Sequence, residues 1–268
     1  MGMTLKFGKI LVCLMIVAGC MGSLRIDSLQ AQTPLRLAAA ADLEPVLPPI
    51  LAEFEKATGI HAEATFQASA MLTTQIQNGA PFDVFFSADV GYPKRLIDAG
   101  LADAAGTADS STPIVYARGT LVLWTRNDSH LTPSLDLLRS PELKRLAVAN
   151  PDRAPYGRAA VAALTSLKLY DELKPKLVTA ENIAQTAQFV DSGNADAGLI
   201  SLTSALTPRL SGAGSYFVMP RELYPPIEQG AVIIRKTTQR VAVHKLLDFV
   251  LSAPVQAQMA KSGLTPVK

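Results

Sequence analysis

Residues 69–89 constrain the fold of this chain more than any other stretch, because they pair one predicted helix with one predicted strand. The segment reads SAMLTTQIQNGAPFDVFFSAD. Leu72 and Ile76 have helical spacing, and Gly79 follows where a helix would end. The apolar run that begins at Val84 is typical of a short buried strand. The segment therefore predicts a helix, a stop and a buried strand in succession.

Ser69 lies at the start of this predicted helix, where the first backbone N–H groups have no partner within the helix. Such groups can bind an anion, and a serine hydroxyl beside them adds a further donor. The alternative is that Ser69 is an N-cap that serves only its own helix. The segment by itself favours that structural role.

The rest of the chain alternates between strand and helix patterns, which indicates an α/β protein. With 268 residues, of which 49% are hydrophobic, it is long and apolar enough for two domains of ordinary size. Pro45, Pro48 and Pro49 indicate that the first helix begins late or with a kink, because a proline beyond the first turn removes a hydrogen bond. A loop is predicted at 151–156. Further strands are predicted at 35–39, 114–124, 146–149, 199–200, 217–218 and 231–234, and helices at 46–54, 92–101, 158–167, 182–190, 241–251 and 254–261.

Residues 1–31 are predicted to be an export leader. Lys6 and Lys9 precede a ten-residue apolar run that is too short to span a bilayer but suits a secretory signal. The sequence VAGC, which ends at Cys20, resembles a lipoprotein cleavage box, and we favour a lipidated Cys20 followed by a tether. The competing cleavage site lies near Ala31. Both cysteines, Cys13 and Cys20, lie in the leader, so the folded part has none for a disulfide or a nucleophile.

The charge and the motifs of the mature chain exclude several function classes. Without residues 1–31 it keeps 22 basic and 22 acidic residues and no Lys/Arg run, so we expect no nucleic-acid partner. Nucleotide-binding and hydrolase motifs are absent from the sequence, and the three histidines are far apart. Asp89 is expected to cap a helix and Asp196 to lie in a turn, rather than to act as acid or base. These observations disfavour an enzyme.

Four motifs, each weak alone, follow one another along the chain. They are AAAADL from Ala38, Ser69 with GAPFDVFFSAD, NPDRAPYGRAA from Asn150, and Glu181-Asn182-Ile183 with GNADAG from Gly193. In this order they resemble the periplasmic molybdate-binding proteins that feed ABC importers, a group within the type II substrate-binding protein family. The similarity covers about residues 35–264.

The resemblance implies a two-lobed α/β fold in which each lobe is a mixed sheet flanked by helices and the ligand lies in the cleft between them. We expect one lobe at 33–116 plus 224–268 and the other at 117–223. The predicted strand at 114–124 leads into the second lobe, and the turn-rich stretch at 223–226 leads back. Both crossings suit hinges.

The resemblance also implies the contacts to the oxyanion. Ser69 would donate through its hydroxyl and backbone N–H from the first lobe, and Ile183 through its backbone N–H from the second. Tyr156 stands where some members have a tyrosine whose hydroxyl reaches the ligand, and we expect the same here. Ser201 stands where some members have a tyrosine and is a weaker candidate. These contacts are to molybdate oxygens, so no residue is a direct ligand of the metal atom.

Asp42 departs from the family pattern, because many members have a hydroxyl residue there. A carboxylate would repel a dianion by several kcal/mol in a poorly hydrated cleft. We therefore expect Asp42 to offer its backbone N–H, with its side chain capping the helix that begins at Leu43. Direct contact by the side chain is the alternative, and it would suit a protonated oxyanion such as hydrogen phosphate, which can donate a hydrogen bond back.

The sequence therefore predicts a non-enzymatic periplasmic receptor that captures molybdate, and also tungstate, and presents it to an inner-membrane ABC permease. We expect a monomer without a cofactor, anchored to the membrane if Cys20 is lipidated. Two other hypotheses remain. The same fold could bind phosphate, sulfate or a small organic anion, and a hydrolase could be built around Ser69 or Ser201, although no partnered histidine accompanies either serine.

Overall fold

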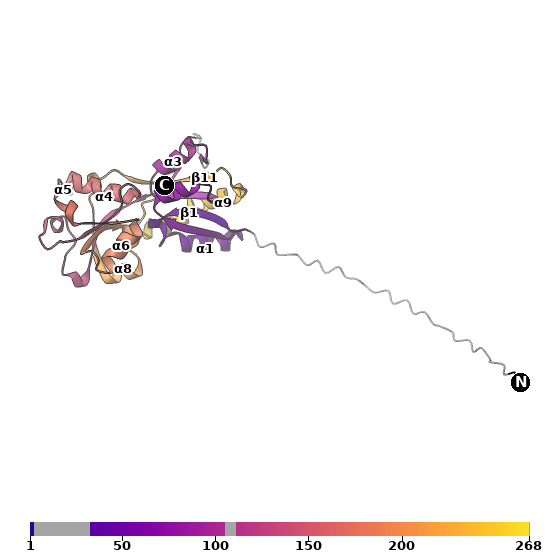
Figure 1. Cartoon of the computed structure of the whole chain (residues 1–268), viewed down its shortest axis with the longest axis horizontal. Coiled ribbons are helices and arrows are strands. Elements are labelled where there is room, and N and C mark those ends of the chain that lie inside the picture. Colours follow the sequence, from indigo (N-terminus) through magenta and orange to yellow (C-terminus); the bar gives the residue numbers. More distant parts are fainter. Residues whose placement is uncertain (3–32, 105–110, 268) are drawn as a thin grey trace. The chain divides into compact units, whose positions relative to one another are not determined.

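The computed structural model of the protein describes residues 1–2, 33–104 and 111–267 (Figure 1). Residues 33–268 form one compact unit. Cys20 and both candidate cleavage sites lie outside the described residues, so the leader and its lipidation stay predictions. Within the part that the structure describes, no helix is long and apolar enough to cross a membrane.

The first of two sheets is mixed. Its order is β2-β1-β3-β11-β4, and β5 pairs with the other end of β11. β1 runs parallel to β2 and β3, whereas β11 is antiparallel to β3, β4 and β5. The strand bounds are β1 (Leu35–Ala40), β2 (Ala62–Gln67), β3 (Val84–Ser87), β4 (Ala102–Ala104), β5 (Ile114–Gly119) and β11 (Ile227–Ile234).

Helices cover both faces of the first sheet. The apolar side chains of β3 alternate, so that Val84 and Phe86 pack with α1, α9 and α10, whereas Phe85 packs with α2 and α3. In Figure 1, α1 and α3 lie on opposite sides of this sheet. The helix bounds are α1 (Leu47–Thr58), α2 (Ser69–Gln77), α3 (Gly91–Asp98), α9 (Arg240–Val250) and α10 (Ala253–Lys261).

The second sheet has the order β10-β6-β9-β7-β8 and is also mixed. β7 is parallel to β8 and β9, whereas β6 is antiparallel to β9 and β10. The strand bounds are β6 (Leu121–Arg126), β7 (Leu146–Ala149), β8 (Leu177–Ala180), β9 (Ala197–Ser201) and β10 (Gly214–Val218).

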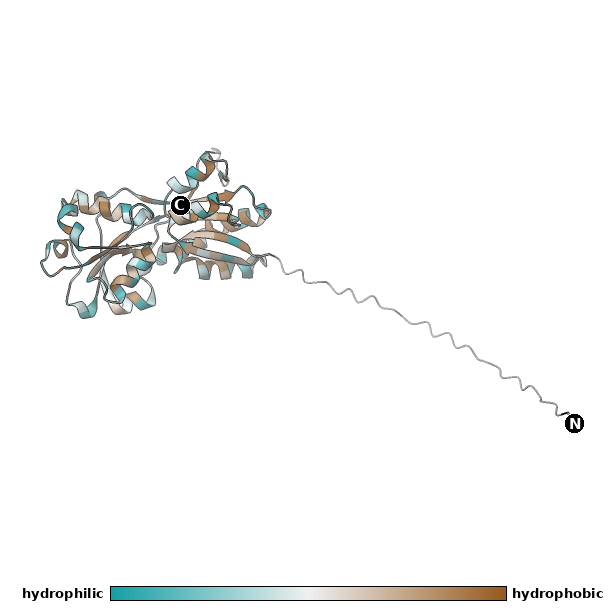
Figure 2. Cartoon of the chain, in the orientation of Figure 1, coloured by the Kyte–Doolittle hydropathy of each residue, from teal (hydrophilic) through white to brown (hydrophobic). Residues whose placement is uncertain are grey.

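This sheet too is covered on both faces. Leu121 and Leu123 of β6 pack with α4 and α5, and Val122 and Trp124 pack with α6, α7 and α8. Figure 2 shows that the helices carry both hydrophobic and hydrophilic residues, as expected for helices with one buried face. The bounds are α4 (Pro155–Ser166), α5 (Tyr170–Leu173), α6 (Ile183–Asp191), α7 (Leu202–Ala205) and α8 (Pro208–Ala213), with short 3₁₀ turns η1 (Ala41–Leu43), η2 (Asn127–Ser129), η3 (Asp136–Arg139), η4 (Lys174–Lys176) and η5 (Arg221–Leu223).

The expected α/β fold with two helix-flanked mixed sheets is confirmed. The single strand predicted at 114–124 is wrong, because the chain leaves the first sheet after Gly119 and enters the second at Leu121. The loop predicted at 151–156 is also too long, since Tyr156 lies in the first turn of α4. The late start of α1 is as predicted, with Pro48 and Pro49 as its second and third residues.

Candidate functional site

A cavity of about 10 Å³ lies where the starts of four helical segments come together, two from each side of the molecule. The segments are η1 and α2, which adjoin the first sheet, and α4 and α6, which adjoin the second. This volume suits about one water molecule. The lining residues are Ala40, Ala41, Asp42, Gln67, Ala68, Ser69, Ala88, Ala154, Pro155, Tyr156, Asn182 and Ile183.

Two of the long helices reach this cavity without a side-chain cap. The residues that precede α2 and α4 are Ala68 and Ala154, and neither can cap a helix with its methyl group. Asn182 precedes α6 and accepts a hydrogen bond from the Gln185 backbone N–H. Helix N-termini carry partial positive charge, so their convergence favours an anion at this place.

Ser69 is the first residue of α2 and not its N-cap, so the structural role that the segment alone favoured is wrong. The side chain is buried, and its hydroxyl oxygen accepts a hydrogen bond from the Ala88 backbone N–H at 3.2 Å. A hydroxyl that accepts one hydrogen bond can still donate its own proton. Ser69 can therefore offer that proton to a ligand in the cavity.

The Asp42 side chain does not cap a helix, which corrects the expectation from the sequence. No side chain caps η1, and Asp42 is completely buried. Its Oδ2 atom accepts hydrogen bonds from the Tyr156 hydroxyl at 3.1 Å and from Gln229 Nε2. The Thr203 hydroxyl donates to the Asp42 carbonyl oxygen at 2.8 Å. The carboxylate thus connects η1 to α4 and β11.

Burial raises the pKa of the Asp42 carboxyl from 3.8 to about 6, although the hydrogen bonds from Gln229 and Tyr156 act in the opposite direction. Among the described residues, Asp42 Oδ1 is a buried polar atom with no hydrogen-bond partner, and so is Gln229 Oε1. A buried acceptor without a donor is costly. The raised pKa means that Asp42 takes up a proton more readily than an exposed carboxyl does, and Oδ1 is the oxygen that still lacks a partner.

Tyr156 lines the cavity, but its hydroxyl proton is directed to Asp42. Burial raises the pKa of this phenol well above its usual range, so the hydroxyl stays neutral. Gly119 makes room for it, because a Cβ at that position would lie 2.2 Å from the Tyr156 hydroxyl. The role expected from the sequence, direct donation by the phenol to the oxyanion, requires that this hydroxyl leave Asp42.

The other two sequence candidates differ in their placement. Ile183 is the first residue of α6 and lines the cavity, so its backbone N–H group belongs to the first turn. Ser201 is buried but is not among the lining residues. Its hydroxyl caps α7 by accepting from the Ser204 backbone N–H at 3.2 Å, and Thr203 donates to it. Ser201 reaches Asp42 only through Thr203.

Contacts at the edge of the cavity connect the two sides of the molecule. Arg158 of α4 forms an ion pair with Asp89, which follows β3. Its guanidinium also donates to the Tyr92 hydroxyl at 3.3 Å and lies 5.4 Å from the centre of that ring. The Ala70 backbone N–H, in the first turn of α2, donates to the Arg153 carbonyl oxygen at 3.2 Å. Arg158 is therefore paired with residues of the first side rather than directed into the cavity.

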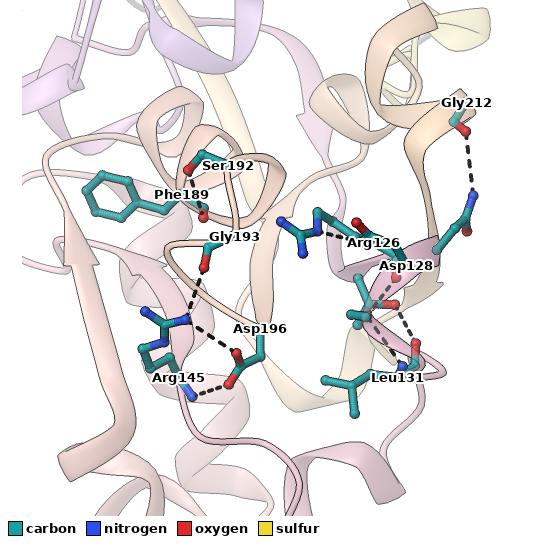
Figure 3. Close-up of polar contacts among 12 residues, drawn as sticks. Arg126, Asp128, Leu131, Arg145, Phe189, Ser192, Gly193, Asp196 and Gly212 are labelled. Carbon is teal, nitrogen blue, oxygen red and sulfur yellow. Dashed lines mark hydrogen bonds and ion pairs between the residues drawn. The ribbon is translucent and has the colours of Figure 1, made fainter.

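The motif GNADAG has a structural role in the second sheet. Asp196 accepts hydrogen bonds from the Lys144 and Arg145 backbone N–H groups. Figure 3 shows the contact of Arg145 with Asp196 and the hydrogen bond from the Arg145 side chain to the Gly193 carbonyl oxygen. Gly193 has a φ of 78°, which favours glycine. The motif thus joins the end of α6 to β9, and the expectation that Asp196 does not act as an acid or base agrees with these contacts.

Larger hollows occur elsewhere in the described part of the chain, at about 450 and 530 Å³. The first is lined by two charged residues, Asp83 and Arg235, and both already have partners. Asp83 accepts hydrogen bonds from the Arg36 backbone N–H and the Thr237 hydroxyl, and Arg235 forms an ion pair with Asp103. Size alone therefore does not select the cavity at the helix starts. Within the described residues no group of three or more His, Cys, Asp or Glu side chains is suited to a metal ion.

Sequence reasoning missed two residues of this site, Gln229 and Gly119. Gln229 is completely buried and contacts Asp42 across 187 positions of sequence. Neither residue belongs to a motif that the sequence analysis identified. The only sign of Gln229 in the sequence is that this polar residue lies two positions before the apolar strand predicted at 231–234.

Comparison with known proteins places the whole folded part of the chain in one family. A family model described as bacterial extracellular solute-binding protein matches residues 35–265. The molybdate-binding protein ModA of Azotobacter vinelandii is 37% identical over 85% of this chain and 88% of that protein. The putative ABC transporter substrate-binding lipoprotein YvgL of Bacillus subtilis is 29% identical over 95% of each.

The same similarity is seen in three dimensions. A solved structure of the Azotobacter vinelandii periplasmic molybdate-binding protein superposes with a TM-score of 0.78 and 29% identity. It covers 87% of this chain and 100% of that chain. The two helix-flanked mixed sheets are therefore those of a periplasmic binding protein fold. The chain belongs to the family of bacterial extracellular solute-binding proteins.

Proposed function

We propose that the protein is an extracytoplasmic receptor that captures molybdate, and also tungstate, and presents it to an ABC permease. The observation that carries the proposal is the set of uncharged donors in one cavity. Ser69 and Ile183 begin helices on opposite sides of it, and no lysine or arginine is among its lining residues. Two relatives, 37% and 34% identical to this chain, are named as molybdate-binding proteins.

The ligand set that we propose is Asp42, Ser69 and Ile183, with contacts to the oxyanion's oxygens. Tyr156, also expected from the sequence to touch the ligand, would support this set by donating its hydroxyl proton to Asp42 Oδ2. Neutral dipoles at helix starts can hold a dianion without a buried cation. The present cavity suits about one water molecule, so a tetrahedral oxyanion requires the two sides to separate and close again around it. Ser201 would support the site through Thr203 and Asp42 rather than touch the ligand.

A second candidate ligand is a protonated oxyanion such as hydrogen phosphate. The observation that favours it is Asp42 Oδ1, a buried acceptor without a donor, to which only a protonated ligand could donate. Sulfate, a further alternative from the sequence, has no proton to give at neutral pH and would be distinguished from molybdate by size. A panel of anions separates these ligands.

We propose no enzymatic activity and no cofactor for this chain. The cavity's lining residues include no histidine that could act as a base for Ser69. The Ser201 hydroxyl is hydrogen-bonded to Ser204 and Thr203, neither of which is a base. His61, for example, is exposed and paired with Glu55 and Glu63. Binding without turnover also agrees with relatives that are named as binding proteins.

We propose that the lobes are residues 33–116 plus 224–268 and residues 117–223. The membership of the two sheets supports this division except at residues 117–119, which belong to β5 of the first sheet. We therefore move the first crossing to Thr120, between β5 and β6. X-ray scattering should then report compaction when molybdate is added to a monomer.

We propose that the leader exports the protein and that Cys20 carries a lipid anchor. A relative named as a lipoprotein supports this assignment. Replacement of Cys20 by serine should release the protein into the soluble periplasmic fraction of the native host. A wild-type protein that is already soluble and begins near Gln32 would instead indicate cleavage after Ala31.

The deciding experiment is a thermal-shift and calorimetric screen of the mature protein with molybdate, tungstate, sulfate and phosphate. A ligand that binds only the native state raises the melting temperature. Ser69→Ala should weaken molybdate binding by roughly tenfold to a hundredfold, since a hydrogen bond to a charged oxygen contributes about 1.5–3 kcal/mol. Thr74→Ala removes an exposed hydroxyl from the same helix and should bind as wild type does. No response to molybdate or tungstate would overturn the proposal.

A further inference from the structure

We propose that Asp42 binds the oxyanion as a neutral carboxylic acid, so that capture of a fully deprotonated dianion takes up one proton from solution. The inference rests on the proposed function and assigns Asp42 the role of a hydrogen-bond donor. The proton would come from bulk water and reside on Oδ1, facing a ligand oxygen. No covalent bond of the ligand changes.

The two carboxyl oxygens of Asp42 differ in their hydrogen bonds, and this difference supports the assignment. Oδ2 accepts from both the Tyr156 hydroxyl and Gln229 Nε2. Oδ1 has no partner, although Asp42 is completely buried and lines the same cavity as Ser69 and Ile183. The two donors on Oδ2 hold it as the carbonyl oxygen of the acid. The hydroxyl of the acid is then Oδ1, which is the atom that still needs a partner.

Among the residues that the structure describes, no lysine, arginine or histidine lines the cavity or is hydrogen-bonded to the Asp42 carboxylate. The titratable groups that face it are Tyr156 from α4 and Tyr116 from β5, and burial raises the pKa of both phenols well above the usual range. The remaining neighbours on β11, β2, α6 and α7 are Gln229, Gln67, Ile183 and Thr203, none of which titrates. Asp89, at the edge, is paired with Arg158. A dianion in the cavity would therefore face Asp42 without an intervening positive charge.

Asp42 gains a proton more readily than an exposed carboxyl does, even before any ligand is present. Burial raises the pKa of its carboxyl to about 6. A dianion beside it must raise that pKa further, because like charges disfavour ionisation. At pH 7.5 the ligand-free protein is thus mostly ionised at Asp42 and the complex is protonated. Binding and proton uptake are then linked.

The linkage has a definite sign. Below about pH 6 the ligand-free protein is already protonated and the affinity for the dianion reaches a plateau. Above that value each molecule that binds must acquire a proton, so the affinity falls by up to tenfold per pH unit. The fall ends where the pH exceeds the pKa of Asp42 in the complex.

The test is titration calorimetry of the mature wild-type protein with micromolar molybdate near pH 7.5 in buffers of different ionisation enthalpy. The slope of observed enthalpy against buffer ionisation enthalpy gives the protons taken up, and we expect a value approaching one. Affinity measured from about pH 6.5 to 8.5 should fall with rising pH. This range avoids the acidity at which free molybdate itself gains protons.

Two variants locate the proton. Asp42→Asn keeps a carbonyl oxygen for Tyr156 and Gln229 and supplies a permanent N–H donor, so its proton uptake should be near zero and its affinity independent of pH. Glu44→Gln removes an exposed carboxylate two residues away and should behave as wild type does. Thermal unfolding without ligand checks that both variants are folded, and the wild-type buffer series decides the question if Asp42→Asn does not fold.

Clear molybdate binding with no proton uptake by wild type would overturn the inference and leave the proposed function intact. Unchanged uptake in a folded Asp42→Asn variant would overturn it as well. Binding of phosphate in preference to molybdate, with no proton uptake, would show instead that Asp42 is the ionised acceptor for a protonated ligand. Failure of wild type to bind molybdate or tungstate at any pH would overturn the proposed function, and with it the inference.

Discussion

Gly119 and Tyr156 lie so close together that a Cβ at position 119 would be 2.2 Å from the Tyr156 hydroxyl and 2.8 Å from the ring carbon that bears it. Gly119 ends β5, and Tyr156 lies in the first turn of α4. The absence of a side chain at the change from one sheet to the other therefore creates the space in which the phenol reaches Asp42.

Gly119→Ala should destabilise the ligand-free protein by about 1–3 kcal/mol, because the added methyl group overpacks a buried contact. The displaced hydroxyl would also lose its hydrogen bond to Asp42, and molybdate binding should weaken. Urea denaturation and calorimetry measure the two effects. In combination with Tyr156→Phe, the loss of stability should be smaller than the sum of the single losses, since the clashing oxygen is gone.

The matched control is Gly212→Ala. Gly212 lies within α8, and a Cβ there would meet nothing within 4 Å. Alanine is preferred to glycine inside a helix, so this variant should be as stable as wild type or slightly more stable. An equal loss of stability in both variants would show that the Tyr156 contact is not responsible.

Arg158→Ala tests whether the contacts at the edge of the cavity hold its two sides together. Arg158 lies against both Asp89 and the Tyr92 ring, and its side chain is 44% exposed. Partly exposed ion pairs contribute about 0.2–1 kcal/mol, and a cation–π contact contributes a similar amount. The affinity for molybdate should therefore fall by about twofold to tenfold, as measured by calorimetry.

Lys94→Ala is the control for that variant, because Lys94 and Asp98 both belong to α3 and their ion pair does not connect this helix to another element. It should bind as wild type does. A loss greater than a hundredfold in Arg158→Ala would indicate that the guanidinium contacts the anion itself. The ligand set proposed above would then be incorrect.

The pH dependence of stability should reveal the buried carboxyl without any ligand. A pKa raised from 3.8 to about 6 in the native state means that the folded protein binds the Asp42 proton more tightly than the unfolded chain does. That stabilisation is fully present below pH 3.8 and is lost as the pH rises through about 6, which amounts to about 3 kcal/mol. Asp42→Asn should thus gain stability over wild type at pH 8, and the difference should vanish near pH 4.

Asp103→Asn should show the opposite trend. Hydrogen bonding to Arg240, with a further contribution from Arg235, lowers the pKa of Asp103 in the native state. Its stabilising effect is therefore present above the ordinary carboxyl pKa and is lost as the pH falls through the lowered value. This variant should be less stable than wild type at pH 8, with the gap closing in acid. Urea denaturation at both pH values measures each difference.

Local signals explain what could be predicted from the sequence. The segment at 69–89 folds as α2 and β3, and Gly79 has a φ of 86°, as its place after the helix requires. Helical spacing and a stop residue are properties of neighbouring positions, so they can be recognised without knowing the rest of the fold. The same holds for Ile183 at the start of α6.

Long-range pairing explains the errors. Residues 114–124 form one apolar run in the sequence, but β5 pairs with β11 and β6 pairs with β9 and β10, so the chain must break between them. The Asp42 side chain, expected to follow the local capping rule, instead accepts from Gln229, which is 187 positions away. A partner that distant leaves no trace in the residues around Asp42.

Weak dependence of binding on salt is the prediction that tests the proposed ligand set most directly. None of Asp42, Ser69 and Ile183 is basic, and the cavity's other lining residues, Tyr156 among them, carry no positive charge. An anion held by buried hydroxyl and N–H dipoles is screened far less than one held by exposed lysines or arginines. Molybdate affinity should thus change by less than about threefold between 50 and 500 mM sodium chloride at fixed pH, as measured by calorimetry. Ser69→Asp should abolish binding, because a carboxylate at the start of α2 would face the dianion inside a closed cavity. A steep fall of affinity with salt, together with wild-type binding by Ser69→Ala, would place the anion outside this cavity.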